Sequence, residues 1–143
     1  MSWYNIGVYR LLNGTLNLAN DTIKVMLVTA DYSFSKGHTV VSQAAVGELK
    51  ASGYAGGFAG FSRKPLIFKT FTASNPAKFS AANLVWYDVG NQENGPVNGA
   101  VLIREATTDE DSLLIARIPL SNLTTTRSDI TVKWGDSILE IGG

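Results

Sequence analysis

Apolar side chains near the start of the chain recur at the spacing of a helix. Ser2 can cap the first turn, and Asn13-Gly14 supplies the left-handed conformers that end a helix. Gly7 lowers the helix propensity, so this helix should need packing partners to form. The pattern predicts a short helix over residues 3–12, within an N-terminal arm of residues 1–14. The apolar positions of the helix are Trp3, Ile6, Val8, Tyr9, Leu11 and Leu12.

The first long strand is predicted over residues 22–29, between the turn signals Asn20-Asp21 and Ala30-Asp31. In a strand, successive side chains point to opposite faces. Here both faces carry apolar groups, which indicates a strand that is covered on both sides, in part by the helix. One face holds Ile23, Val25, Leu27 and Thr29, and the other holds Lys24, Met26 and Val28.

Further strands are predicted at short, regular turn spacings along the rest of the chain. Segment 15–19 is a possible short strand. Residues 40–49 could form one or two helical turns or a strand broken at Gly47, and irregular structure is favoured. Two hairpins are expected, one joining 100–104 to 113–120 and one joining 129–134 to 137–141. The pattern predicts an all-β fold, a β-sandwich or jelly roll in a single domain of residues 1–143. The remaining predicted strands are 66–72, 77–81 and 84–89.

Two groups of aromatic residues are candidates for contacts with a partner. Trp3 and Tyr4 lie at the N-terminal end of the chain, and aromatics there are either part of the core or docked onto another protein. Tyr54, Phe58 and Phe61 alternate with glycines in a segment that we expect to be a mobile loop. Rings on such a loop are common interface anchors, and the alternative is that they fill the core.

Composition narrows the classes of function. Twelve basic residues balance twelve acidic ones, so the formal net charge is zero. This argues against a nucleic-acid binder and against a basic membrane-surface protein, and it favours self-association. There is no cysteine, no apolar run long enough for a membrane span and no secretory signal, which predicts synthesis and folding in the cytoplasm.

The sequence offers little that resembles catalytic chemistry. His38, the only histidine, lies in a polar loop near Asp31 and Ser35 without the strand-turn-helix motif of a nucleophile. The acidic run 109–111 lacks the calcium-loop pattern and is expected to form a solvated hairpin tip. Arg63-Lys64 is expected on a solvated edge. Trp86 and Trp134 could line a sugar cleft, but core packing is the expected role. We therefore expect no enzyme activity, no cofactor and no metal.

The order of several motifs resembles that of a family of small virion structural proteins of tailed bacteriophages. The matching pieces span most of the chain, but the glycine-rich segment 50–62 and the loop 91–98 depart from the family pattern. The pieces are L-L-N-G at 11–14, D-T-I-K-V-M-L…Y-x-F at 21–34, S-G-Y at 52–54, A-x-N-L-V-W at 81–86, L-I-A-x-I-x-L at 114–120 and I-T-V-x-W…I-L at 130–139.

The resemblance implies a β-sandwich protein that binds the outer surface of a phage head and cements the capsid lattice. Its partner would then be the major capsid protein, its location the capsid surface, and its oligomeric state a homotrimer, as is common around local three-fold axes. The alternative is a tail, fibre or baseplate component that binds a host surface or another tail protein. A carbohydrate-active enzyme is disfavoured because the sequence shows no acid-base pair in a cleft.

Overall fold

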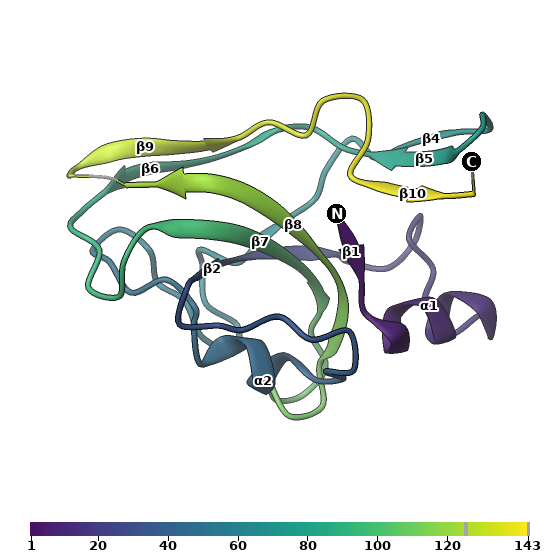
Figure 1. The fold of residues 1–143 in the computed structure, drawn as a ribbon, viewed down its shortest axis with the longest axis horizontal. Helices are drawn as coiled ribbons and strands as arrows, with labels where there is room; N and C mark the ends of the chain where they lie inside the picture. Colours follow the sequence, from purple (N-terminus) through teal and green to yellow (C-terminus); the bar gives the residue numbers. More distant parts are fainter. Residues whose placement is uncertain (125, 143) are drawn as a thin grey trace.

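The structure is a computed structural model that describes residues 1–124 and 126–142. Strands hold 39% of the chain and helices 9%, so the predicted all-β fold with a short N-terminal helix is confirmed. The elements, in chain order, are β1 (Ser2–Trp3), α1 (Asn5–Leu12), β2 (Lys24–Thr29), α2 (Val41–Ala45), β3 (Lys64–Pro65), β4 (Thr70–Thr72), β5 (Ala77–Ser80), β6 (Leu84–Val89), β7 (Val97–Arg104), β8 (Leu113–Leu123), β9 (Ser128–Val132) and β10 (Leu139–Ile141) (Figure 1).

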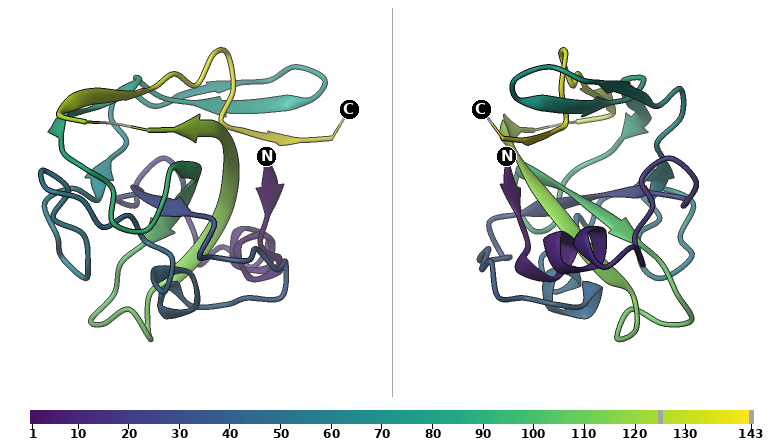
Figure 2. Two further views of the ribbon diagram at one scale, coloured as in Figure 1. Left: turned by 60° about the vertical axis from the view of Figure 1, so that its left-hand side comes forward. Right: turned by 90° about the vertical axis from the view of Figure 1, so that its right-hand side faces the viewer.

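The strands form two layers. One layer is a five-stranded antiparallel sheet in the order β1-β8-β7-β2-β3. The other contains a three-stranded sheet, β10-β5-β4, and a pair, β6-β9, which lie end to end above the first layer (Figure 1). Both helices lie toward the other side of the five-stranded sheet, away from these smaller sheets (Figure 2). The predicted hairpin of segments 100–104 and 113–120 is confirmed as β7 and β8.

Strand β2 is covered on both faces, as its sequence indicates. Val25 and Leu27 belong to the large core between the layers, whereas Met26 and Val28 belong to a second core on the opposite face. Val41 and Ala44 of α2 take part in the second core, and Ile6 of α1 packs against both. A sheet with apolar side chains on both faces needs such covering, so the helices complete the burial of the central strands.

The N-terminal helix begins later than predicted. Residues 2 and 3 form β1, which pairs with β8, and Tyr4 precedes the helix without a side-chain cap from Ser2. Trp3 donates its indole N–H to the Glu140 carbonyl oxygen at 3.2 Å, which ties β1 to β10. Gly7 packs directly on β8, because a Cβ at this position would lie 2.5 Å from the Ile115 carbonyl oxygen. The packing partners that the helix requires therefore include backbone atoms of β8.

Several predicted elements are wrong in ways that long-range contacts explain. Segment 15–19 forms turns, and residues 41–45 form α2 within the segment that was expected to be irregular. The predicted strand 66–72 is reduced to β4 because Phe68 has a φ of 53°, outside the extended region. The predicted hairpin of 129–141 is absent: β9 pairs with β6 and β10 with β5.

Trp134 explains why the last two strands separate. Its backbone N–H donates to the Asn83 side-chain oxygen, and its indole N–H donates to the Ala82 carbonyl, both at 3.0 Å. These bonds hold the segment between β9 and β10 against the start of β6. The chain thus passes from one small sheet to the other instead of turning back on itself.

Candidate functional site

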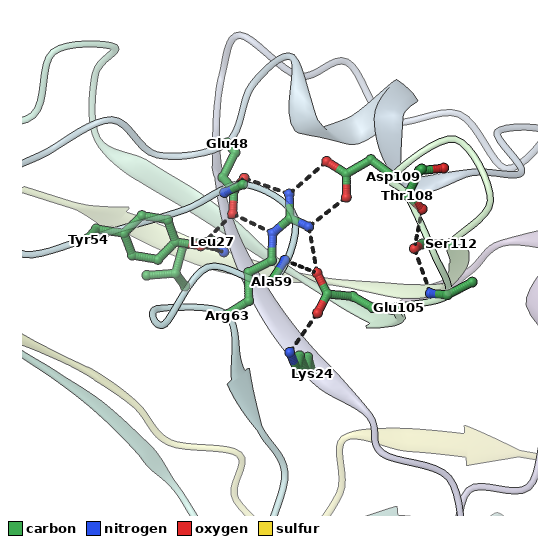
Figure 3. Close-up of polar contacts among 12 residues, drawn as sticks. Lys24, Leu27, Glu48, Tyr54, Ala59, Arg63, Glu105, Thr108, Asp109 and Ser112 are labelled. Carbon is green, nitrogen blue, oxygen red and sulfur yellow. Dashed lines mark hydrogen bonds and ion pairs between the residues drawn. The ribbon is translucent and has the colours of Figure 1, made fainter.

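A buried arginine forms the most unusual polar site of the protein. Arg63 is 1% exposed and donates five hydrogen bonds, which is the number of N–H donors in a guanidinium group (Figure 3). Two bonds reach Glu48 at 2.9 and 2.8 Å, two reach Asp109 at 2.8 and 3.2 Å, and one reaches Glu105 at 3.1 Å. Arg63 is therefore satisfied by three carboxylates.

Two further side chains complete this cluster. Lys24 of β2 pairs with Glu105 at 2.6 Å. The buried Tyr54 hydroxyl donates to Glu48 at 2.9 Å and accepts the Leu27 backbone N–H at 3.0 Å. Two cations, Arg63 and Lys24, thus face three carboxylates, which leaves the cluster with one formal negative charge. We call Lys24, Glu48, Tyr54, Arg63, Glu105 and Asp109 the Arg63 cluster.

The protonation of the cluster follows from its burial and its hydrogen bonds. Burial lowers the pKa of Arg63, but the bonds with Glu48 and Asp109 outweigh it and raise that pKa above its ordinary value. Burial likewise tends to raise the pKa of Glu105, yet hydrogen bonds from Lys24 and the Ala59 amide hold it below the ordinary range. Burial and the Glu48 charge raise the pKa of Tyr54 well above 10. Around neutral pH, Arg63 is therefore charged, Glu105 ionised and Tyr54 neutral.

The members of the cluster come from segments far apart in the chain. Glu48 follows α2 and bridges to Val28, Arg63 directly precedes β3, and Glu105 directly follows β7. Asp109 lies in the β7–β8 turn, which the Ser112 hydroxyl fixes by donating to the Thr108 carbonyl at 2.6 Å (Figure 3). The expectation that Arg63 stands on a solvated edge is wrong, and Asp109 is not a free hairpin tip. Its carboxylate is taken up by the guanidinium group.

The cluster also fixes the glycine-aromatic loop of residues 52–63. The Gly57 amide donates to Glu48 at 2.9 Å, and the Ala59 amide donates to Glu105 at 3.0 Å. Ala59 has a φ of 59°, a left-handed conformation that a residue with a Cβ adopts only when its surroundings hold it there. Trp86 of β6 closes the loop by donating its indole N–H to the Ser62 carbonyl at 2.6 Å. The backbone of this loop is thus anchored at several points, in contrast to the mobile loop that we expected.

The five predicted interface residues fall into three groups by their exposure. Tyr4 and Tyr54 are buried within the chain's own cores, so they are not available as anchors, which corrects that part of the prediction. The Tyr4 hydroxyl bonds to the Tyr32 hydroxyl at 2.8 Å. Trp3 is half-buried and packs against the main core. Phe58 and Phe61 project from the loop, with 42% and 94% of their surface exposed.

A pocket of about 630 Å³ opens beside the Arg63 cluster. Glu48 and Asp109 line it, but their oxygens already accept hydrogen bonds from Arg63. His38 lies in a different region, where its Nδ1 is 2.8 Å from the Tyr32 hydroxyl. No group of three or more His, Asp or Glu side chains that could hold a metal ion occurs in residues 1–124 and 126–142. The geometry suits a structural clamp that holds the loop in place.

Sequence reasoning missed Glu48 and Glu105 completely. Glu48 stands between Gly47 and Leu49 in a segment without clear periodicity, and Glu105 follows a predicted strand as any solvated residue could. The one available signal was Arg63 itself, an arginine flanked by the aromatic Phe61 and the apolar strand that follows Lys64. Such a position is compatible with burial, but it does not identify the carboxylates that would balance the charge.

Neither of the helices in the described part of the chain has the length and apolar character needed to cross a membrane. Comparison of the chain with protein-family models, with curated proteins and with solved structures finds no significant match.

Proposed function

We propose that this protein is a non-enzymatic virion structural protein that binds the outer surface of a phage head and cements its capsid lattice. The proposal combines the motif order that resembles phage structural proteins with a loop built to present aromatic side chains. Its partner is the major capsid protein, and its location is the capsid surface. We further propose that the protein is a homotrimer, as the resemblance implies, when it is bound at the local three-fold axes of the capsid.

The observation that carries the proposal is the exposure of Phe61 on a loop whose backbone is fixed. A phenylalanine that is 94% exposed gains nothing for the isolated chain, and burying such a ring on a partner is worth roughly 1.5–3 kcal/mol. The hydrogen bonds of Gly57 and Ala59 to the Arg63 cluster order the loop before any partner arrives. Binding then costs less conformational entropy, which is the advantage of a pre-organised anchor.

The buried cluster itself supports this interpretation. A buried ion pair is often no more stabilising than well-packed apolar residues of the same volume, and in some proteins it instead confers conformational specificity. Here the carboxylates fix the middle and the C-terminal end of one surface loop. We infer that the cluster serves to shape the binding surface around Phe58 and Phe61.

Stabilisation of the capsid follows from the thermodynamic linkage between binding of this protein and assembly of the lattice. A protein that binds only the assembled lattice stabilises that lattice by mass action, and repetition over the shell multiplies a modest contact. A rigid aromatic anchor on each copy is sufficient for such a role. No reaction chemistry is required of the protein.

The test uses heads of the phage whose genome encodes this chain, prepared without the protein. Purified protein is added back, and bound copies are counted after sedimentation. We expect Phe61→Ser to bind at least about tenfold more weakly than wild type, equivalent to about 1.4 kcal/mol. Leu12→Ser is the matched control, because Leu12 is 82% exposed but lies on α1 away from the loop.

Cryo-electron microscopy of the intact particle then locates the protein. Density over the head lattice that disappears in particles lacking the gene is the expected result. Density on the tail, fibre or baseplate would contradict the capsid location and favour the alternative assignment. Equal binding of Phe61→Ser and wild type would contradict the role of the loop.

A further inference from the structure

Strand β4 forms an open edge of the three-stranded sheet. The strand order β10-β5-β4 leaves it with a neighbour on one side, and Thr70, Phe71 and Thr72 are all exposed. An edge strand presents backbone N–H and C=O groups that can pair with a strand from another chain. Phe71 adds a ring that is 54% exposed.

Strand β4 is only three residues long, which limits pairing, but it carries none of the charged or proline residues that usually block an edge. Strand β3, the edge of the five-stranded sheet, contains a lysine and a proline, both of which block the addition of a strand. Strand β4 contains neither. The nearest lysine, Lys69, donates to the carbonyl oxygens of Leu18 and Asp21 at 2.8 and 2.5 Å, so its charge is directed away from the edge.

The sequence of β4 is complementary to itself. Threonine, phenylalanine and threonine read the same in both directions, so two antiparallel β4 strands centred on Phe71 match at each position. Phe71 of one copy would face Phe71 of the other, and Thr70 would face Thr72 on both sides. Aromatic pairs and threonine pairs are among the cross-strand contacts that stabilise sheets. In a two-fold contact the same residues of both copies face one another, and here they form only such favourable pairs.

The neighbouring strands extend the apolar row. Phe71 is opposite Phe79, with ring centroids 5.1 Å apart, and Phe79 is opposite Leu139. These side chains line an apolar groove of about 130 Å³ that also contacts Trp3, Leu18 and Ile141. Phe71 of a second copy would extend this row of apolar side chains across the β4 edge and cover the exposed Phe71 ring. The burial of both rings would supply the favourable free energy.

Charge does not oppose the contact. Lys78 of β5 pairs with Asp136 at 2.7 Å, and the whole chain has a formal net charge of zero. Two copies therefore approach without the repulsion that a charged edge would create. A strand from another protein could use the same backbone groups, but the self-matching sequence favours a second copy.

We infer that two copies of this chain associate through antiparallel β4 strands about a two-fold axis at Phe71. The two three-stranded sheets become one continuous six-stranded sheet, in the order β10-β5-β4-β4-β5-β10. The inference does not depend on the proposed function, because the pairing takes place in the free protein. For the protein in solution it replaces the trimer expected from the resemblance. On a lattice it would join neighbouring three-fold groups in pairs.

Sedimentation velocity over a concentration series tests the inference. Wild type should reach a dimer at high concentration. Phe71→Lys and Phe71→Glu should each be monomeric, because the two-fold axis brings like charges together. An equimolar mixture of the two variants should form a dimer, because the introduced ammonium group of one chain would then face the introduced carboxylate of the other. Leu12→Lys is the matched control and should dimerise as wild type does, since Leu12 is 82% exposed and lies on α1, outside β4.

Each alternative result would overturn the pairing. A wild type that stays monomeric at millimolar concentration would contradict the self-pairing and favour a strand of another protein as the partner of β4. A trimer in solution would exclude the two-fold contact. A Phe71→Lys variant that still dimerises, or a mixture that stays monomeric, would exclude the Phe71 register. Circular dichroism establishes that each variant is folded. If Phe71→Lys unfolds, the double variant Thr70→Lys, Thr72→Lys makes the same test, because each introduced lysine would then face a lysine of the other copy.

Discussion

The hydroxyl group of Tyr54 lies 2.9 Å from an oxygen of Glu48, and both side chains are buried. The same hydroxyl accepts the Leu27 amide, so Tyr54 joins the central strand β2 to the Arg63 cluster. A ring predicted to face a partner therefore contributes to the interior. It also connects the core of the sandwich to the loop that carries Phe61.

Removing this hydroxyl should destabilise the fold. In Tyr54→Phe the Leu27 N–H loses its acceptor and Glu48 loses one donor, and a buried unsatisfied group costs about 1–3 kcal/mol. Urea unfolding should show a lower midpoint with an unchanged slope. Tyr87→Phe, a change at an exposed ring of β6, should leave the midpoint within error. Equal midpoints for Tyr54→Phe and wild type would show that water replaces the hydroxyl.

Arg63→Met should be far more damaging, because it leaves three carboxylates together with no guanidinium group. The loss of one partner of a buried ion pair costs about 3–5 kcal/mol. Arg127→Met is the control, since Arg127 and Asp88 form an exposed pair that is worth roughly 0–1 kcal/mol. Both unfolding free energies can be measured by urea titration.

A second change separates charge from packing in this cluster. The double variant Arg63→Met, Glu48→Gln removes one of the uncompensated charges and should recover part of the stability lost in Arg63→Met. An additive loss in the double variant would mean that the two side chains do not interact. That outcome would contradict the description of Arg63 and Glu48 as a bidentate pair.

Acid should weaken the protein through Glu105. Folding lowers the pKa of this carboxyl below its ordinary value of 4.5. Its contribution to stability is therefore complete above that value and is lost as the pH falls through the lower pKa of the folded state. Unfolding free energies measured from neutral pH downward should fall more steeply for wild type than for Glu105→Gln.

The control for this pH dependence is Asp136→Asn. Asp136 also has a lowered pKa, from its bond with Lys78, but it is fully exposed and water screens the interaction. We expect its acid profile to follow that of wild type closely. Parallel profiles for Glu105→Gln and wild type would contradict the assignment to Glu105.

Gly7→Ala should destabilise the protein although alanine is the better helix former. The added Cβ would lie 2.5 Å from the Ile115 carbonyl oxygen, a backbone atom of β8 that cannot rotate away. Overpacking of this kind typically costs about 1–3 kcal/mol. Arg10→Ala on the exposed side of α1 should change the thermal midpoint little. A raised midpoint in Gly7→Ala would show that α1 shifts away from β8 at no cost.

The features that the sequence could predict are those that depend on residues close together in the chain. The two covered faces of β2 and the β7–β8 hairpin follow from local patterns, and both are confirmed. The Arg63 cluster does not, because Arg63 meets carboxylates that are 15, 42 and 46 positions away. The hydrophobic periodicity of the sequence does not predict contacts between side chains so far apart in the chain. The failed 129–141 hairpin has the same origin, since Trp134 bonds to residues more than 50 positions earlier.

The bond from Trp3 to Glu140 spans 137 positions, and β1, β9 and β10 also pair with strands that are far from them in the chain. Contacts between such distant segments form slowly, because the entropy of closing a long loop is lost before the contacts contribute favourable free energy. During refolding, the apolar edges of β5 and β6 would therefore stay exposed until β10 and β9 pair with them. Recovery of native protein from denaturant should therefore decline as the protein concentration rises, because intermolecular association competes with these last pairings.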